Sequence, residues 1–141
     1  MGPRADEDGN LGFALPMGDQ KLPGIAAADI GRCAFGIFKA GDEYIGRTVG
    51  IAGEHLTGAE MAAALSDAYG QPVSYIEVPF DVYRGLDFPG ADDLGNMFQF
   101  KHDFNDYFTG ARDLEQSRRL TPALLSFSTW LAANTDRIPI Q

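Results

Sequence analysis

The chain has 141 residues, 45% of them apolar, and a formal net charge of −9 with a sequence pI of about 4.5. This length and composition predict one domain, residues 1–141, with a real hydrophobic core. The acidic surface excludes nucleic acid and anionic membrane surfaces as partners, because it repels their phosphates, and no apolar run is long enough to span a bilayer.

Two further features bear on the compartment. The first ten residues, MGPRADEDGN, are charged and lack the apolar core of a signal peptide. Cys33 is the only cysteine, which excludes an internal disulfide framework and fits a reducing environment. Both observations favour a cytoplasmic protein.

The chain is predicted to begin with a flexible tether or turn over residues 1–10. Asp6, Asp8 and Asn10 resemble a calcium loop, but the sixth position is Leu11 rather than Gly, and the twelfth position is not Glu. A solvated turn is therefore the better interpretation. Residues 11–15 are then predicted to form a strand, followed by a loop around Met17 that is rich in Pro and Gly.

A first helix is predicted after Asp29. The apolar residues of this stretch recur at helical spacing and would form one face that packs on a sheet: Ile30, Cys33, Ala34, Ile37 and Phe38. Cys33 would lie on that buried face. A structural thiol is favoured there, because reactive thiolates need accessible and electropositive surroundings.

The stretch 46–79 is predicted to be a β-α-β unit. Its first strand would cover residues 47–52 and its second residues 73–78. Between them, Thr57 and Glu60 match a T-x-x-E capping box, and Gly70 suits the left-handed end of the helix.

Shorter elements are predicted in the last third of the chain. Residues 80–86 suit a short helix, and a longer helix is expected to start near Pro89. Thr121-Pro122 is expected to begin a turn of helix, and Ser126 to cap a last helix whose apolar residues form a hydrophobic plug. The three arginines of this region lie among acidic residues and are expected to form a solvated, paired surface: Arg112, Arg118 and Arg119.

No catalytic, cofactor-binding or metal-binding residues are predicted. The glycine-rich stretch 53–58 has phosphate-loop spacing, but Ala59 and Glu60 stand where Lys and Ser/Thr are required. No Tyr-x-x-x-Lys pair occurs, and one Cys and two His cannot complete a structural zinc site. The aromatic stretch 97–108 favours core packing, with a ligand pocket as the alternative. The pocket candidates are Met17, Met97, Phe98 and His102.

Several segments resemble the C-terminal part of NmrA-like proteins, from Leu11 to Leu131. These segments are LPMGDQKLPGIAAADIGRCAFGIF, EYIGRTVGIAGEHLTGAEMAAALSDAYGQPVSYIEVP, LDFPGADDLGNMFQF and a closing F-x-x-WL. The run FPGADDLGNMF, which begins at Phe88, is the most specific piece. The resemblance implies an α/β fold, namely the C-terminal portion of a Rossmann-like fold related to extended short-chain dehydrogenases, with few strands, packed helices and a small helical substrate-side region.

The resemblance also implies NAD(P) as the cofactor of a full-length form, bound by a glycine-rich loop in an N-terminal half that this sequence does not contain. No cofactor is therefore expected for this chain alone. A sheet without that half would leave an uncovered edge and an apolar face, which predicts a protein partner or self-association there. A small-molecule ligand is a further expectation.

Three functional interpretations remain open at this point. The first is a non-catalytic regulatory or binding module, shortened relative to NAD(P)-binding family members. The second is the substrate-side part of an NAD(P)-dependent oxidoreductase that needs its N-terminal half. The third is a truncated gene product or a mis-started gene model.

Overall fold

A three-stranded sheet that packs against helices on one face is the centre of the fold. The computed structural model describes residues 2–140, so Met1 of the predicted tether lies outside the described residues. Strands β1 (Arg4–Ala5), β2 (Leu11–Leu15) and β5 (Val73–Glu77) form the sheet in the order β1-β2-β5. β1 pairs antiparallel with β2, whereas β2 and β5 are parallel. The α/β fold class predicted from the sequence is confirmed, and so is the strand at residues 11–15.

The N-terminal segment contains a short strand and a turn. Arg4 and Ala5 pair with Gly12 and Leu11, and Pro3 is fully buried. The predicted turn is present, because the Asp6 carboxylate accepts hydrogen bonds from the backbone N–H groups of Asp8 and Asn10. The Asn10 side chain also donates to Asp6 and is the main reason that the pKa of Asp6 is lowered. The turn is closed by its own hydrogen bonds.

Helix α2 (Gly58–Tyr69) covers the buried face of the sheet. Thr57 Oγ1 accepts from the Glu60 backbone N–H, and the Glu60 carboxylate accepts from the Thr57 N–H at 2.8 Å, so the predicted capping box is confirmed. Gly70 ends the helix with φ 67°. The core lies between this helix, β2, β5, α4 (Ala91–Asp103) and α7 (Phe127–Asn134). Its buried residues include Leu11, Phe13, Leu15, Ala62, Leu65, Val73, Tyr83 and Leu131.

The predicted β-α-β unit is wrong in its first strand. Residues 47–52 form no strand; the strand before α2 is instead β4 (Glu54–Leu56), and it pairs antiparallel with β3 (Leu22–Gly24) in a second, two-stranded sheet. Tertiary contacts override the β propensity of this segment. The Ala52 N–H donates to Ser117 Oγ at 3.0 Å, and a Cβ on Gly50 would collide with the Ala111 carbonyl. The segment therefore packs on a helix instead of pairing with a strand.

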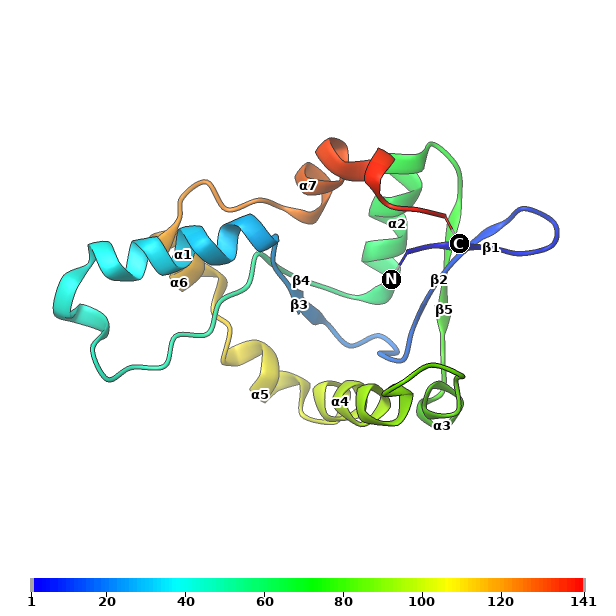
Figure 1. Cartoon of the computed structure of the whole chain (residues 1–141), viewed down its shortest axis with the longest axis horizontal. Coiled ribbons are helices and arrows are strands. Elements are labelled where there is room, and N and C mark those ends of the chain that lie inside the picture. Colours follow the sequence, from blue (N-terminus) through cyan, green and yellow to red (C-terminus); the bar gives the residue numbers. More distant parts are fainter. Residues whose placement is uncertain (1, 141) are drawn as a thin grey trace.

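Helix α1 (Ala27–Lys39) and the turn η1 (Gly41–Tyr44) form an arm away from the central sheet (Figure 1). The predicted apolar face of α1 does not pack on a sheet: Ile30 and Phe38 are 49% and 82% exposed. The helix instead contacts α6 (Leu114–Leu120) through an adjacent side, where a Cβ on Gly36 would collide with the Leu120 carbonyl. Cys33 belongs to both sides and is fully buried, as predicted. The close approach of the two backbones decides which face is buried.

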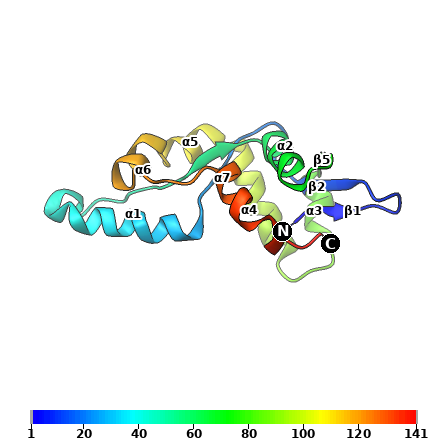
Figure 2. The ribbon, with the colours of Figure 1, turned by 90° about the horizontal axis from the view of Figure 1, so that it is seen from above.

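In Figure 2, α1 and the β1–β2 turn lie at opposite ends of the molecule. The remaining helices lie at both ends of the sheet: residues 80–110 run along the end where β2 and β5 finish, and residues 127–134 lie beside α2 at the other end (Figure 1). They are α3 (Phe80–Arg84), α4 (Ala91–Asp103), α5 (Asn105–Gly110), α7 (Phe127–Asn134) and the turn η2 (Thr135–Arg137). The predicted Ser126 cap is confirmed, since its hydroxyl accepts from the Thr129 N–H. Thr121-Pro122 forms a hydrogen-bonded turn rather than a helix, because the chain there turns back toward α7.

The sequence does not predict helix α6. Its region is predicted instead to be a solvated surface of paired charges. Arg112 in particular is not a solvated ion-pair partner. Its guanidinium lies 3.7 Å from the centroid of the Phe108 ring and also donates to the Phe108 carbonyl. The charge pattern alone does not reveal this cation–π contact.

Candidate functional site

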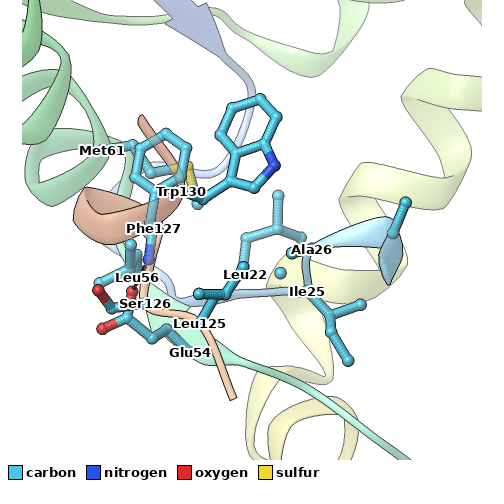
Figure 3. A pocket seen from close by; sticks show the side chains of 12 residues that line it. Leu22, Ile25, Ala26, Glu54, Leu56, Met61, Leu125, Ser126, Phe127 and Trp130 are labelled. Carbon is cyan, nitrogen blue, oxygen red and sulfur yellow. Dashed lines mark hydrogen bonds between the residues drawn. The ribbon is translucent and has the colours of Figure 1, made fainter. Parts of the chain in front are cut away.

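An apolar cavity of about 310 Å³ lies where the two-stranded sheet meets α1, α2 and α7 (Figure 3). Its volume is at the lower end of the range for small-molecule sites. Its walls are mostly hydrocarbon, with Leu22 and Leu56 opposite each other on β3 and β4. The full lining is Leu22, Gly24, Ile25, Ala26, Ala27, Glu54, Leu56, Met61, Leu125, Ser126, Phe127 and Trp130.

Hydrogen bonds between distant segments hold these walls. The Gly53 N–H donates to the Gly24 carbonyl at 2.7 Å, which closes the end of the β3–β4 pair. Glu54 Oε2 accepts from the Phe127 N–H at 2.6 Å and so fixes the start of α7 on β4. The cavity is therefore built from elements that lie up to about a hundred residues apart in sequence.

The sequence-predicted pocket residues do not come together in one cavity. Met17 and Phe98 are core residues, 0% and 4% exposed, and Met97 packs against the same core. His102 instead lines a separate groove of about 380 Å³, together with Gly18 and Glu77.

His102 also makes a hydrogen bond with the next residue in the chain. His102 Nδ1 lies 2.9 Å from Asp103 Oδ1, and this hydrogen bond is the main reason that the pKa of Asp103 is lowered. The edge of the Phe80 ring packs on the imidazole. No serine, threonine or cysteine lines this groove, so the pair has no nucleophile to activate within the described residues.

The glycine-rich stretch 53–58 has a structural role. Gly58 lies against the Tyr75 ring, where a Cβ would collide with it, and Glu60 belongs to the helix cap. The pKa of Glu60 is lowered chiefly by the Thr57 backbone N–H. The backbone and side-chain groups of this loop are thus engaged within the fold.

Cys33 and His55 are also structural. Cys33 is fully buried, and burial together with the Asp29 charge raises the pKa of its thiol, which makes it a poor nucleophile. His55 Nε2 lies 2.9 Å from the Arg112 carbonyl. Residues 2–140 contain no group of three or more Cys, His, Asp or Glu side chains that could hold a metal ion.

The outer face of the central sheet is open and forms a second, larger hollow of about 990 Å³. Small residues of β2 and β5 line it around Ile76, which has 50% of its surface exposed. Val78, Tyr83 and Leu94 form part of its rim.

In relation to membranes, none of the helices in the described part of the chain is long and apolar enough to cross a bilayer.

Sequence reasoning missed the cavity because its walls come from four separate stretches of the chain, residues 22–27, 54–56, 61 and 125–130. Phe127 and Trp130 are recognisable as a hydrophobic plug, and that plug is one wall of the cavity. The opposite wall, at Ile25 and Ala26, carries no motif. The β3–β4 pairing and the hydrogen bond from the Leu125 N–H to Asp29 place it near α7.

A family model described as the NmrA-like family matches residues 2–131. An NmrA-like family domain-containing oxidoreductase, lnbB, from Aspergillus flavus is 31% identical over 100 residues, which are 67% of this chain and 29% of that protein.

Solved structures show the same fold at about 20% identity. NmrA, a negative transcriptional regulator, has a TM-score of 0.71 in its complex with NAD, and the match covers 91% of this chain and 44% of NmrA. A nucleoside-diphosphate-sugar epimerase from Staphylococcus aureus has a TM-score of 0.69, with 86% and 43% covered. The chain thus spans less than half the length of these relatives.

Proposed function

The chain belongs to the NmrA-like family, and we propose that it acts as a non-catalytic, regulatory module that binds a small molecule in the cavity beneath α7. The cavity itself is the observation that carries this proposal. It is apolar and of ligand size, and no nucleophile paired with a base is found among its lining residues. The few polar groups of the cavity can orient a ligand by hydrogen bonding, but they do not form a catalytic arrangement.

A fluorescence titration tests this function. Trp130 is the only tryptophan of the chain and lines the cavity, so its emission reports on the site without a label. N-phenyl-1-naphthylamine, a neutral apolar dye, should quench Trp130 by energy transfer and saturate at one dye per chain.

Matched variants separate this site from the rest of the surface. Ala26→Phe fills the cavity from the start of α1, whereas Ala28→Phe places the same ring at an exposed position two residues later. Dye binding should be lost in Ala26→Phe and kept in Ala28→Phe. Equal binding by both variants, or no saturable binding by the natural chain, would refute a ligand site in this cavity.

We also propose that the open sheet face accepts a nucleotide-binding half carried by another segment or chain. Sheets of this α/β type are covered by helices on both faces, whereas the helices among residues 2–140 pack on one face and leave the other open. The relatives of known structure have about twice this length, and NmrA structures hold NAD or NADP. NAD(P) would reach the module only through such a half, because the chain has no glycine-rich cofactor loop.

A second candidate function is the substrate side of an NAD(P)-dependent oxidoreductase. The similarity to the Aspergillus flavus oxidoreductase favours it. Mixing this chain with the N-terminal half of that oxidoreductase, NADPH and 2-naphthaldehyde, whose carbonyl carbon can accept a hydride and a proton to give the alcohol, would distinguish the two functions. If this chain is a regulatory module, the mixture does not oxidise NADPH with any ligand that binds the cavity. If it is the substrate side of an oxidoreductase, the mixture oxidises NADPH with at least some of these ligands.

A further inference from the structure

Two nearly parallel aromatic rings form a wall on one side of the cavity. Phe127 and Trp130 lie three residues apart on α7, their ring planes differ by 8°, and their centroids are 6.5 Å apart. Both rings border the cavity (Figure 3). Such a wall offers a broad π surface, and aromatic ligands gain energy from offset stacking on it beyond the burial of their area.

One hydrogen-bond donor remains free in this wall. The Trp130 indole N–H has no partner among residues 2–140, and no buried side-chain donor in that range is left unsatisfied, so the group is accessible. In Figure 3 the indole nitrogen lies on the edge of the ring nearer Leu22. A ligand that stacks on the wall could therefore accept a hydrogen bond at its rim.

The acidic group of the cavity restricts the charge of the ligand. Glu54 contributes to the lining, and only its Oε2 is engaged, by the Phe127 N–H. Glu54 is half-buried among apolar side chains, and a carboxylate in such surroundings repels an anion more strongly than one in bulk water. The net charge of −9 acts in the same direction.

We infer that the cavity takes a planar aromatic ligand, neutral or cationic, that carries a hydrogen-bond acceptor on its rim for the Trp130 N–H. The inference rests on the proposed ligand-binding function and adds the chemical class of the ligand. It excludes sugars, whose many hydroxyl groups would lose their hydrogen bonds to water against hydrocarbon walls. It also excludes aromatic carboxylates.

Three probes of similar shape test the class. Quinoline is neutral at neutral pH and has a ring nitrogen acceptor, naphthalene has the same shape without it, and 2-naphthoate adds a negative charge. The single tryptophan gives one indole N–H signal in a nitrogen–proton correlation spectrum. Quinoline should move that proton downfield and bind about five-fold more tightly than naphthalene, as expected for one net hydrogen bond. 2-Naphthoate should bind at least about five-fold more weakly than naphthalene.

Two variants isolate the groups involved. Trp130→Phe keeps a ring but removes the donor, so quinoline and naphthalene should then displace the dye equally well. Glu54→Gln keeps an acceptor for the Phe127 N–H but removes the charge, and it should recover 2-naphthoate binding. A chemical-denaturation curve for each variant shows that it is folded.

The outcomes separate the two proposals. If none of the probes, nor the dye, binds in a saturable way, the ligand-binding function itself fails. If naphthalene binds as tightly as quinoline, or 2-naphthoate binds best, the cavity is a ligand site but the inferred class is wrong. Tighter quinoline binding that is unchanged in Trp130→Phe would also overturn the inference, because the acceptor would then contact another group.

Discussion

Asp29 accepts a hydrogen bond from the backbone N–H of Leu125, with 2.8 Å between Oδ2 and N, although 96 residues separate the two. The same carboxylate is fully buried and pairs through Oδ1 with Arg32 at 2.6 Å. It joins the first turn of α1 to the segment that leads into α7. Since both segments line the cavity, one buried carboxylate controls the distance between two of its walls.

Asp29→Ala is therefore expected to damage both stability and ligand binding. The Leu125 N–H and the Arg32 guanidinium would lose their partner, at a cost of about 2–3 kcal/mol in the free energy of unfolding. Urea denaturation measures this cost, and dye titration measures the affinity of the cavity. Asp42→Ala, at an exposed acidic position in η1, is the control and should change neither. A fully stable Asp29→Ala variant would contradict the role given to this contact.

The capping box of α2 predicts a local and pH-dependent contribution to stability. Thr57→Ala should lower the free energy of unfolding by about 1 kcal/mol, because the Glu60 N–H loses its acceptor. Thr48→Ala, at an exposed position outside any helix, is the matched control. Urea denaturation of both variants measures the difference, and an equal loss in the two would contradict the capping role.

The titration of Glu60 gives a second, independent prediction. Its pKa is lowered in the folded chain, chiefly by the Thr57 backbone N–H, so its stabilising effect is fully present above the unfolded value of about 4.3. The effect declines as the pH falls through that value toward the folded pKa. The stability difference between the natural chain and Glu60→Gln should therefore shrink between pH 6 and pH 3, as followed by urea denaturation. A difference that stays constant over this range would show that the carboxylate is not engaged.

Gly58 and Gly31 should respond in opposite ways to alanine. A Cβ at Gly58 would collide with the Tyr75 ring, so Gly58→Ala should destabilise the chain by about 1–3 kcal/mol. Gly31 lies on the exposed side of α1, where an added Cβ would have no atom within 4 Å, and Gly31→Ala should stabilise by about 0.5–1 kcal/mol. Thermal unfolding compares the two. Stabilisation by Gly58→Ala would exclude the packing role argued above.

The open sheet face predicts where a nucleotide-binding half docks. Ile76→Lys places a charge in the middle of that face, whereas Phe38→Lys places one on the exposed side of α1. Binding to the N-terminal half of the Aspergillus flavus oxidoreductase, measured by calorimetry, should weaken by at least about ten-fold for Ile76→Lys. Phe38→Lys should bind as the natural chain does. Weaker binding by Phe38→Lys with unchanged binding by Ile76→Lys would place the docking surface on α1 instead.

Local signals in the sequence predict most of the elements. The strand at residues 11–15, the cap at Thr57 and Glu60, the Gly70 helix end and the Ser126 cap all depend on neighbouring residues, and all are present. The strand predicted at residues 47–52 does not form, because the Ala52 N–H donates a hydrogen bond to Ser117, which lies 65 residues away in the sequence. No local pattern encodes that contact.

The buried face of α1 illustrates the same limit. Its hydrophobic periodicity is real, but Asp29 and Gly36 decide which side faces the protein, through Leu125 and Leu120. Hydrophobic periodicity does not place either residue on a buried face, because it treats a carboxylate as polar and a glycine as neither polar nor apolar. The cavity was missed for this reason too, because the Asp29 contact is what brings Ile25 and Ala26 opposite α7.

Methionine methyl signals test the central claim most directly, because the chain places methionines in both the observed cavity and the sequence-predicted pocket. Met61 lines the cavity, whereas Met17 and Met97 lie in or beside the core. With methyl-labelled methionine, addition of N-phenyl-1-naphthylamine should shift the Met61 signal in a saturable way and leave those of Met17 and Met97 in place. Shifts at Met17 and Met97 with an unchanged Met61 signal would contradict the account and return the ligand site to the aromatic stretch of α4.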